Sequence, residues 1–238
     1  MIYIGTSGWQ YKHWIGVFYP EGLRQKDWFE FYSRYFNTVE VNYSFYRVPS
    51  EKTFIKWREE SPDGFIFSLK ASRYITYSQN PRKISYILYL FQRRAYLLKE
   101  KRGPILIQFP KGYKRDDMAL VSLIGFLRED FRWTVEFRDR SWFSEDVYNI
   151  LKERNIAMCI IDSPDIRTPL ITTSDFAYFR MHGREDWYAS CYSDKELKEL
   201  SERLNPLSRE VKDVYVYFNN DASGYAVMNA LRLKEYLN

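Results

Sequence analysis

The fold is decided by residues 132–161, which read RWTVEFRDRSWFSEDVYNILKERNIAMCII. The stretch begins with an apolar run at 132–137 and ends with a second at 156–161, and both have the length and the β-branched or aromatic content of strands. Between them, Ser144 is followed by Glu145 and Asp146. This order is typical of a helix start, because a hydroxyl and nearby carboxylates suit the free amides of the first turn. The stretch therefore predicts strand, helix and strand in succession.

The same alternation continues on both sides of this stretch. Further strand-like runs occupy 2–6, 37–41, 65–70, 104–109, 176–182 and 213–218, which makes eight predicted strands. The clearest helix pattern is formed by apolar residues at the spacing of one buried helix face, namely Ile84, Ile87, Leu88, Phe91, Ala95 and Leu98. Another helix begins with the capping box Ser193-Asp194-Lys195-Glu196, and its inward residues are Leu197, Leu200 and Leu204.

Eight strands that alternate with helices predict a closed parallel barrel. We expect one TIM (β/α)8 domain over residues 1–238, because no linker, repeat or low-complexity tract interrupts the alternation. Residues 163–175 contain Pro164 and Pro169 and show no apolar periodicity. We therefore expect the sixth helix to be short or missing.

The composition limits the class of protein. The chain has 36 Lys and Arg against 31 Asp and Glu, a formal charge of +5 that favours anionic ligands only mildly. Its two cysteines, Cys159 and Cys191, provide neither a disulfide framework nor a cysteine-based zinc site. No signal peptide or membrane-spanning run is visible. We expect a soluble cytoplasmic protein.

Polar residues gather at the carboxyl ends of the predicted strands, where the active sites of such barrels lie. In chain order, these ends supply Thr6, Ser7 and Trp9; Glu40 and Asn42; Lys70 and Arg73; Gln108; Glu136 and Arg138; Asp162; Arg180, His182 and Arg184; and Asn219, Asn220 and Asp221. Convergence of so many polar groups at one face is typical of a ligand site.

The cationic members of this set favour an anion. Five of them are suited to phosphate or carboxylate, namely Lys70, Arg73, Arg138, Arg180 and Arg184. Two alternatives stay open: a solvated basic rim, and structural ion pairs such as Glu136 with Arg138 or Arg180. The substrate-binding set that we predict adds Trp9, Asn42, Gln108, Asn219 and Asp221.

Four residues are candidates for catalysis. Glu40, Glu136, Asp162 and His182 can bind a divalent cation such as Mn²⁺ or Mg²⁺, with zinc as an alternative through the histidine, or they can act as general acids and bases without a metal. A hydrogen-bonded structural imidazole is the alternative for His182. Aromatic residues such as Trp9, Trp14, Tyr43 and Trp187 flank the same loops, either to stack on a ligand or to anchor the loops.

Five groups of residues together resemble one family. They are Gly5-Thr6-Ser7-Gly8-Trp9; Thr38-Val39-Glu40-Val41-Asn42 with Ser44-Phe45-Tyr46-Arg47 and Pro49; Val135-Glu136-Phe137-Arg138 with Ser141-Trp142; Arg180-Met181-His182-Gly183-Arg184; and Tyr217-Phe218-Asn219-Asn220-Asp221. This pattern is similar to that of domain of unknown function 72, or YecE-like proteins. The resemblance implies a TIM barrel and no particular activity.

The chain departs from the family pattern at two places. Tyr77 follows Ile75-Thr76 where many members have a histidine, and Lys111 follows Pro110 where a second proline is common. If the family histidine is functional, Tyr77 changes that function here. The implied fold also resembles the barrels of metal-dependent sugar isomerases and DNA-repair endonucleases, which is an analogy of fold alone.

Three functional hypotheses follow. The first is an enzyme, with a hydrolase favoured, that acts on a phosphorylated or nucleic-acid substrate through acid-base or metal-assisted chemistry. The second is a non-catalytic protein that binds nucleic acid or an anionic metabolite, and the third is a carbohydrate-active enzyme with two carboxylates. The chain lacks the Walker, G-x-G-x-x-G, G-x-S-x-G and H-E-x-x-H motifs, so none of the corresponding enzyme classes is indicated.

Overall fold

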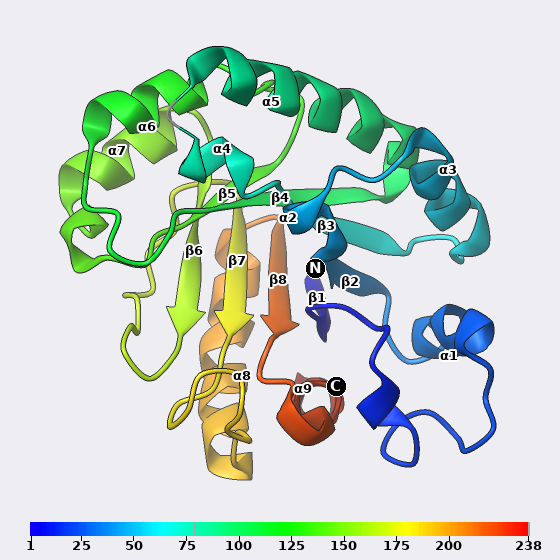
Figure 1. Cartoon of the computed structure of the whole chain (residues 1–238). Helices are drawn as coiled ribbons and strands as arrows, with labels where there is room; N and C mark the ends of the chain where they lie inside the picture. The colour runs from blue at the N-terminus through cyan, green and yellow to red at the C-terminus, as the bar shows by residue number, and fades with distance from the viewer. Residues whose placement is uncertain (79, 238) are drawn as a thin grey trace.

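The computed structural model describes residues 1–78 and 80–237 and shows a single α/β domain with eight parallel strands in a nearly closed barrel (Figure 1). The strands are β1 (Ile2–Thr6), β2 (Thr38–Val41), β3 (Ile66–Lys70), β4 (Arg102–Gln108), β5 (Trp133–Glu136), β6 (Ala157–Asp162), β7 (Phe176–Met181) and β8 (Asp213–Phe218). Their order is β1-β8-β7-β6-β5-β4-β3-β2. The predicted barrel and all eight predicted strands are confirmed.

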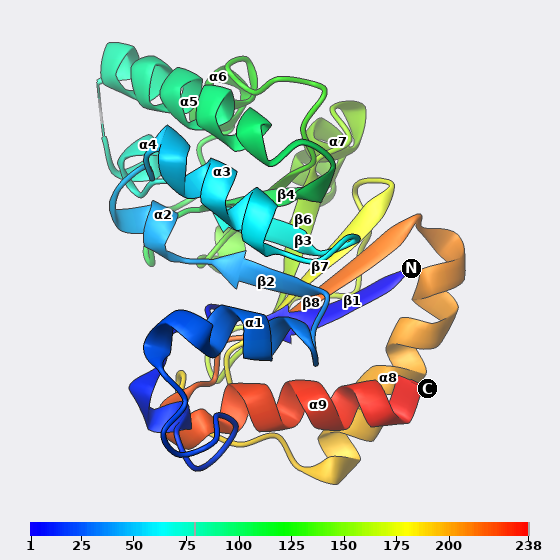
Figure 2. The same cartoon turned by 90° about the vertical axis from the view of Figure 1, so that its right-hand side faces the viewer.

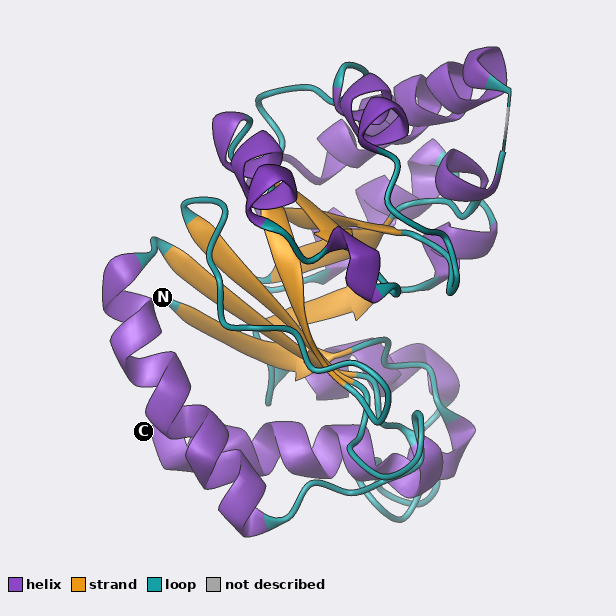
Figure 3. Ribbon diagram, turned by 90° about the vertical axis from the view of Figure 1, so that its left-hand side faces the viewer, coloured by secondary structure: helices purple, strands orange, loops and turns teal. Residues whose placement is uncertain are grey.

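Helices surround the barrel on the outside (Figures 2 and 3). They are α1 (Trp28–Ser33), α2 (Tyr43–Tyr46), α3 (Glu51–Glu60), α4 (Tyr74–Tyr77), α5 (Pro81–Ala95), α6 (Asp117–Ile124), α7 (Glu145–Glu153), α8 (Asp194–Glu210) and α9 (Tyr225–Leu237), with short 3-10 turns at Lys12–Trp14, Gln25–Asp27, Tyr96–Lys101, Arg140–Trp142 and Ala222–Gly224. In Figure 2 α5 and α6 lie on one side of the strands, while α8 and α9 lie on the opposite side. Among the described residues, no helix has the length and apolarity needed to cross a membrane.

The predicted helix starts are found, with one difference in capping. Ser193 and Glu196 form the expected capping box of α8, whose leucines are buried. Ser144 precedes α7, but its hydroxyl caps no amide and instead accepts a hydrogen bond from Nη1 of Arg115 at 2.9 Å. Residues 163–175 contain no helix, as their sequence predicts. The Ser144 hydroxyl, which the local sequence predicts as the cap of α7, is therefore hydrogen bonded to Arg115 from a distant loop instead.

The barrel is incomplete between β1 and β2, which are the two ends of the hydrogen-bonded strand order. The Tyr32 hydroxyl bridges this seam: it accepts from the Thr6 amide at 3.1 Å and donates to the Thr38 carbonyl at 3.0 Å. Gly5 lets the strands approach, because a Cβ there would overlap the Thr38 carbonyl oxygen. One buried side chain thus replaces a backbone bond across the seam.

Hydroxyl groups fill the middle of the barrel, below the strand ends that form its mouth. Tyr178 and Ser68 are hydrogen bonded at 2.8 Å, and Tyr217 and Thr38 at 2.7 Å, each pair spanning the barrel between distant strands. All four side chains are buried. Because each of these buried hydroxyls has a hydrogen-bond partner, they form a fully bonded polar layer below the side chains of the mouth.

Candidate functional site: an ionic cluster at the barrel mouth

Arg180, on β7, crosses the mouth of the barrel and is fully buried. Its guanidinium donates to Glu40 from Nε at 3.0 Å and from Nη2 at 2.7 Å, and to Glu136 from Nη1 at 2.5 Å. The two glutamates lie on β2 and β5, so Arg180 joins three parts of the barrel wall. Both carboxylates face inward, which the sequence alone leaves undecided because one step of register reverses a side chain.

The two carboxylates accept further hydrogen bonds, so each of their four oxygens has at least one donor. Glu40 accepts from the hydroxyls of Ser7 at 2.7 Å and Tyr178 at 2.6 Å, and Glu136 accepts from Nε of Arg138 at 2.6 Å. Burial opposes ionisation of Glu136, but Arg180 and Arg138 outweigh it and hold the pKa of this carboxyl well below its usual range. The ion-pair interpretation of Glu136 with these arginines is therefore confirmed in geometry.

Lys70 ends β3 beside this cluster and is only 9% exposed. Its Nζ lies 4.1 Å from the centre of the Phe45 ring, and no hydrogen bond or carboxylate within 4.0 Å is found for it in the described part of the chain. Burial, with a contribution from Arg180, lowers its pKa to about 7. With Lys70 protonated, three cations (Lys70, Arg138, Arg180) face two carboxylates (Glu40, Glu136), so the cluster has one positive charge in excess.

His182, just beyond β7, is fully buried in the same cluster. Burial and then Arg180 hold its pKa well below the usual value, so the ring is neutral at pH 7. Its Nδ1 lies 3.2 Å from the amide nitrogen of Asn219, which donates, so the ring proton belongs on Nε2. Nε2 has no hydrogen-bond partner among the described residues, and its nearest carboxylate oxygen, on Glu136, is 3.9 Å away. His182 therefore carries a buried neutral donor that is unsatisfied beside Glu136.

The other predicted site residues lie farther out. Asp162 pairs with Arg184 at 2.9 Å, and Asp221 accepts from Trp14 Nε1 at 2.8 Å and lies 2.9 Å from His13. Arg73 stacks over Tyr46 on the rim. The structure thus brings seven predicted residues together at the mouth, namely Glu40, Lys70, Glu136, Arg138, Arg180, His182 and Asn219, while Asp162, Arg184, Asp221 and Arg73 occupy separate contacts.

A cavity of about 360 Å³ opens beside the mouth between the loops after β1 and β2. It is lined by Trp9 and Asn42, together with Tyr11, Tyr43 and Trp57. The Asn42 Oδ1 and the Oε1 of Gln108, which pairs in register with Glu136, are buried and have no partner among the described residues. Two further hydrogen-bond acceptors at or near the mouth therefore have no donor among the described residues.

The four residues predicted as metal ligands are not arranged as a coordination shell. Arg180 lies between Glu40 and Glu136, and Asp162 turns toward Arg184. Among the described residues, no group of three or more His, Cys, Asp or Glu has the geometry of a metal site. Metal binding by this set stays a prediction, and we derive no step from it.

Three residues of the cluster lie outside the predicted site. Tyr178 precedes Arg180 by two positions and so shares its face of β7, a signal that strand periodicity contains. Tyr188 accepts from Arg138 Nη1 at 3.1 Å, and Phe45 packs beside Lys70. No local pattern distinguishes these last two from other loop aromatics. Tyr77, which departs from the family pattern described above, is exposed on α4.

Relatives of this chain are found along its whole length. UPF0759 protein YunF of Bacillus subtilis is 28% identical over 270 residues, which cover 100% of this chain and 95% of YunF. UPF0759 protein YecE of Escherichia coli O157:H7 is 29% identical over 169 residues, or 68% of this chain and 60% of YecE.

Solved structures agree with the fold. A DUF72 family protein of Thermotoga maritima superposes with a TM-score of 0.89 at 34% identity and covers 100% of this chain and 99% of its own. A DUF72 family protein of Enterococcus faecalis, at 22% identity and a TM-score of 0.87, covers 100% and 96% and supports the fold alone. The family model described as "Protein of unknown function DUF72" matches residues 3–238. The chain therefore belongs to the DUF72 family.

Proposed function

We propose that the barrel mouth binds the phosphate of a phosphorylated or nucleic-acid substrate and that the protein is a hydrolase acting on that substrate. The observation that supports this most is Lys70, a lysine only 9% exposed whose Nζ has no protein partner in the described chain, beside two carboxylates that are already paired with arginines. A cation withdrawn from most of its water without a partner costs free energy, and a bound anion offsets that cost.

Three donors are available to such an anion. Lys70 contributes Nζ, His182 contributes the unpaired Nε2, and Arg138 keeps an Nη2 for which no partner is found among the described residues. Phosphoryl transfer depends mainly on positioning and on stabilising negative charge, which such donors supply. His182, neutral at pH 7, can donate a hydrogen bond from Nε2–H to a substrate oxygen on which negative charge develops.

The carbohydrate-active alternative fits this geometry less well. A glycosidase needs one carboxyl group that gives up a proton and another with a free oxygen. Glu40 and Glu136 share Arg180, and hydrogen bonds occupy their oxygens. We therefore pursue the phosphate hypothesis.

The test measures binding and turnover separately. Inorganic phosphate is titrated by calorimetry into the native protein, into Lys70→Met and into Lys111→Met, a control at an exposed lysine of the mouth loops. We expect Lys70→Met alone to lose at least tenfold in affinity. Equal affinities in all three proteins overturn the proposed anion site.

Turnover is then followed with p-nitrophenyl phosphate and bis-p-nitrophenyl phosphate. Hydrolysis that His182→Ala lowers while phosphate affinity changes little supports a catalytic mouth. Phosphate binding without ester hydrolysis above the Lys70→Met background supports the non-catalytic binding protein instead.

A further inference from the structure

A second basic surface runs along the outside of the barrel, on α5. Residues 64–99 contain no Asp or Glu, but they include seven basic side chains (Lys70, Arg73, Arg82, Lys83, Arg93, Arg94 and Lys99) and five tyrosines (Tyr74, Tyr77, Tyr86, Tyr89 and Tyr96). All five tyrosines are exposed, Tyr86 and Tyr89 by 64% and 60%. Exposed rings that alternate with cations, without acidic residues between them, are not explained by packing of the core.

The spacing of these residues places them in one line. Arg82, Tyr86, Tyr89, Arg93 and Tyr96, which we call the α5 stripe, follow one another at intervals of four and three residues. Such intervals keep side chains on a single helix face. At about 1.5 Å per residue the α5 stripe is about 21 Å long.

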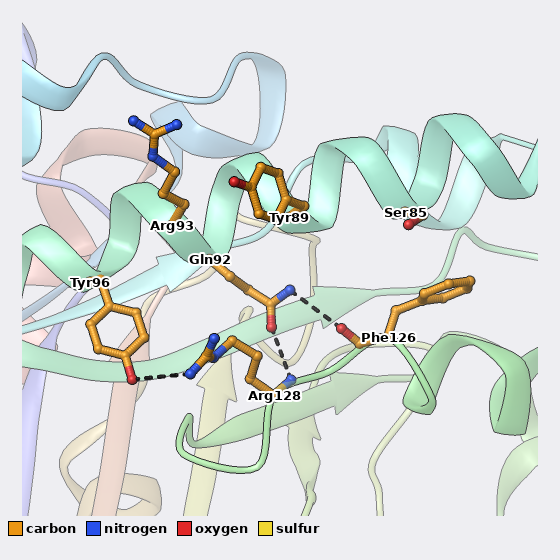
Figure 4. Close-up of a pocket in the computed structure, with 7 residues that line it drawn as sticks. All are labelled: Ser85, Tyr89, Gln92, Arg93, Tyr96, Phe126 and Arg128. Atoms are coloured by element: carbon orange, nitrogen blue, oxygen red, sulfur yellow. Dashed lines mark hydrogen bonds between the residues drawn. The ribbon is translucent and has the colours of Figure 1, made fainter.

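Two adjoining pockets lie along the α5 stripe, and Figure 4 shows the residues that line the first of them. One pocket of about 440 Å³ is lined by Ser85, Tyr89, Gln92, Arg93, Tyr96, Phe126 and Arg128, and a second of about 600 Å³ by Pro81, Arg82, Ser85, Tyr86, Tyr89 and Phe126. Because the two share Ser85, Tyr89 and Phe126, they form one continuous trough. Phe126 adds a fourth ring to those of Tyr86, Tyr89 and Tyr96.

The cations of the trough are placed beside its rings. The Arg128 guanidinium lies 5.2 Å from the centre of the Tyr96 ring, and Arg102 covers the same ring at 4.5 Å. Arg93 pairs with Glu51 and Arg128 with Asp130, both at the exposed surface where such pairs contribute little. Arg82 has no ion pair within 4.0 Å in the described chain. The trough therefore keeps an unneutralised positive end next to α4.

We propose that the α5 stripe binds single-stranded nucleic acid, with bases stacked on its rings and phosphates paired with its arginines. Aromatic platforms combined with a basic groove are the arrangement by which proteins hold single strands of any sequence. No described residue that lines the trough is a leucine, isoleucine, valine or tryptophan. Grooves for amphipathic helices are commonly lined by such aliphatic side chains, so their absence favours stacked bases over a partner helix.

The α5 stripe leads to the mouth described above. α4 precedes α5, and its neighbour Arg73 lies over Tyr46 and Tyr74 at the end of β3, while Lys83 of α5 lies 4.7 Å from the Tyr74 ring centre. This inference rests on the proposed function for the chemistry at the mouth, since it makes the phosphorylated substrate a nucleic-acid strand.

The experiment measures fluorescence anisotropy of labelled dT12 with the full chain at several salt concentrations. The variants are Tyr86→Ala/Tyr89→Ala and Arg82→Ala, with Arg34→Ala/Tyr35→Ala as the matched control, since it removes an exposed cation and ring on the C-terminal side of α1. We expect the tyrosine pair to weaken binding at least about fivefold. Arg82→Ala should reduce the slope of log affinity against log salt by about 0.7. The control should bind dT12 with the affinity of the native protein. A dT12·dA12 duplex, whose bases are already paired, should bind more weakly than dT12 if binding depends on stacking of bases on the rings.

The outcomes separate this inference from the proposed function. If Lys70→Met loses phosphate but keeps dT12, and the tyrosine pair does the reverse, both ideas are supported. If dT12 binding depends on Lys70 and not on the tyrosines, the strand binds at the mouth alone and the α5 stripe inference is wrong. Binding of anionic vesicles or an acidic peptide without dT12 binding also overturns it.

Discussion

Arg180 places a positive charge where no water reaches, and two carboxylates from other strands hold it there. A buried charge pair adds little net stability compared with an apolar replacement of the whole set, but removing one member leaves the others uncompensated. At the scale of the residue, Arg180 is therefore the position at which a single substitution has the largest expected cost.

We predict that Arg180→Met lowers the free energy of unfolding by about 3–5 kcal/mol, because Glu40 and Glu136 are left buried without their cation. Urea denaturation measures this. Arg209→Met, at an exposed arginine in the last turn of α8, is the control and should change stability little. A loss below 1 kcal/mol for Arg180→Met would contradict the role we give this residue.

Lys70 makes anion binding depend on pH. Its pKa of about 7 in the folded protein means that it loses its charge as pH rises through this value, in a cluster with Arg138, Arg180, Glu40, Glu136 and the neutral His182. We predict that affinity for sulfate, whose charge is constant over this range, is highest below pH 7 and falls above it. A bound anion shifts the midpoint upward, because it favours the charged amine.

Lys70→Arg supplies the control for this pH dependence, since arginine stays charged over the whole range. Sulfate affinity of the Lys70→Arg protein should be flat from pH 6 to pH 9. Isothermal titration at each pH measures both proteins. An unchanged affinity of the native protein across pH 7 would show that Lys70 is not the group that holds the anion.

Much of the site can be predicted residue by residue, because a polar side chain at the end of an apolar strand has few reasons to be there. This rule finds Glu40, Lys70, Glu136, Arg180 and His182. It fails for Asp162 and Asp221, since a strand end leaves the direction of the side chain open, and both turn to partners in loops. The missing partner of Lys70 is a property of three-dimensional packing and has no trace in the sequence.

At the scale of the element, the seam between β1 and β2 depends on one hydroxyl of α1. We predict that Tyr32→Phe lowers the free energy of unfolding by about 1–3 kcal/mol, because the buried Thr6 amide and Thr38 carbonyl lose a shared partner. Urea denaturation measures the loss, and hydrogen exchange should show reduced protection of the Thr6 amide.

Tyr35→Phe serves as the control for the seam, since this tyrosine is exposed and lies three residues further along the chain. It should leave stability and the exchange of Thr6 unchanged. Equal stability of Tyr32→Phe and the native protein would mean that the seam closes without the hydroxyl.

Strands and long helices of this fold can be predicted because their buried faces repeat at fixed intervals. The same argument identifies residues 163–175 as non-helical. The short helices α2 and α4 give no such repeat, since one turn of four residues cannot show a periodicity. Ser144 shows a further limit of prediction from local sequence. Its hydroxyl is expected to cap α7 but is hydrogen bonded to Arg115, which is distant in the chain.

At the scale of the whole molecule, the melting temperature tests whether the mouth takes a divalent cation. We predict that Mn²⁺ or Mg²⁺ at millimolar concentration leaves it unchanged, because Arg180 already holds the carboxylates that a metal would need. Differential scanning calorimetry measures this for the native protein and for Glu136→Gln. A cation-dependent rise that Glu136→Gln abolishes would restore the metal-assisted hydrolase.

The order of the strands also affects how the chain is made. In the described structure β1 pairs with β8, and β2 lies across the seam without a backbone ladder. About 200 residues separate Thr6 from Asp213, which at roughly 5–20 residues per second corresponds to about 10–40 s of synthesis on the ribosome. During that time the amides and carbonyls of β1 form an open strand edge, to which another chain can add. The barrel strand that is translated before the other seven thus receives its partner last, so a nascent chain that stalls before β8 is the form of this barrel most exposed to aggregation.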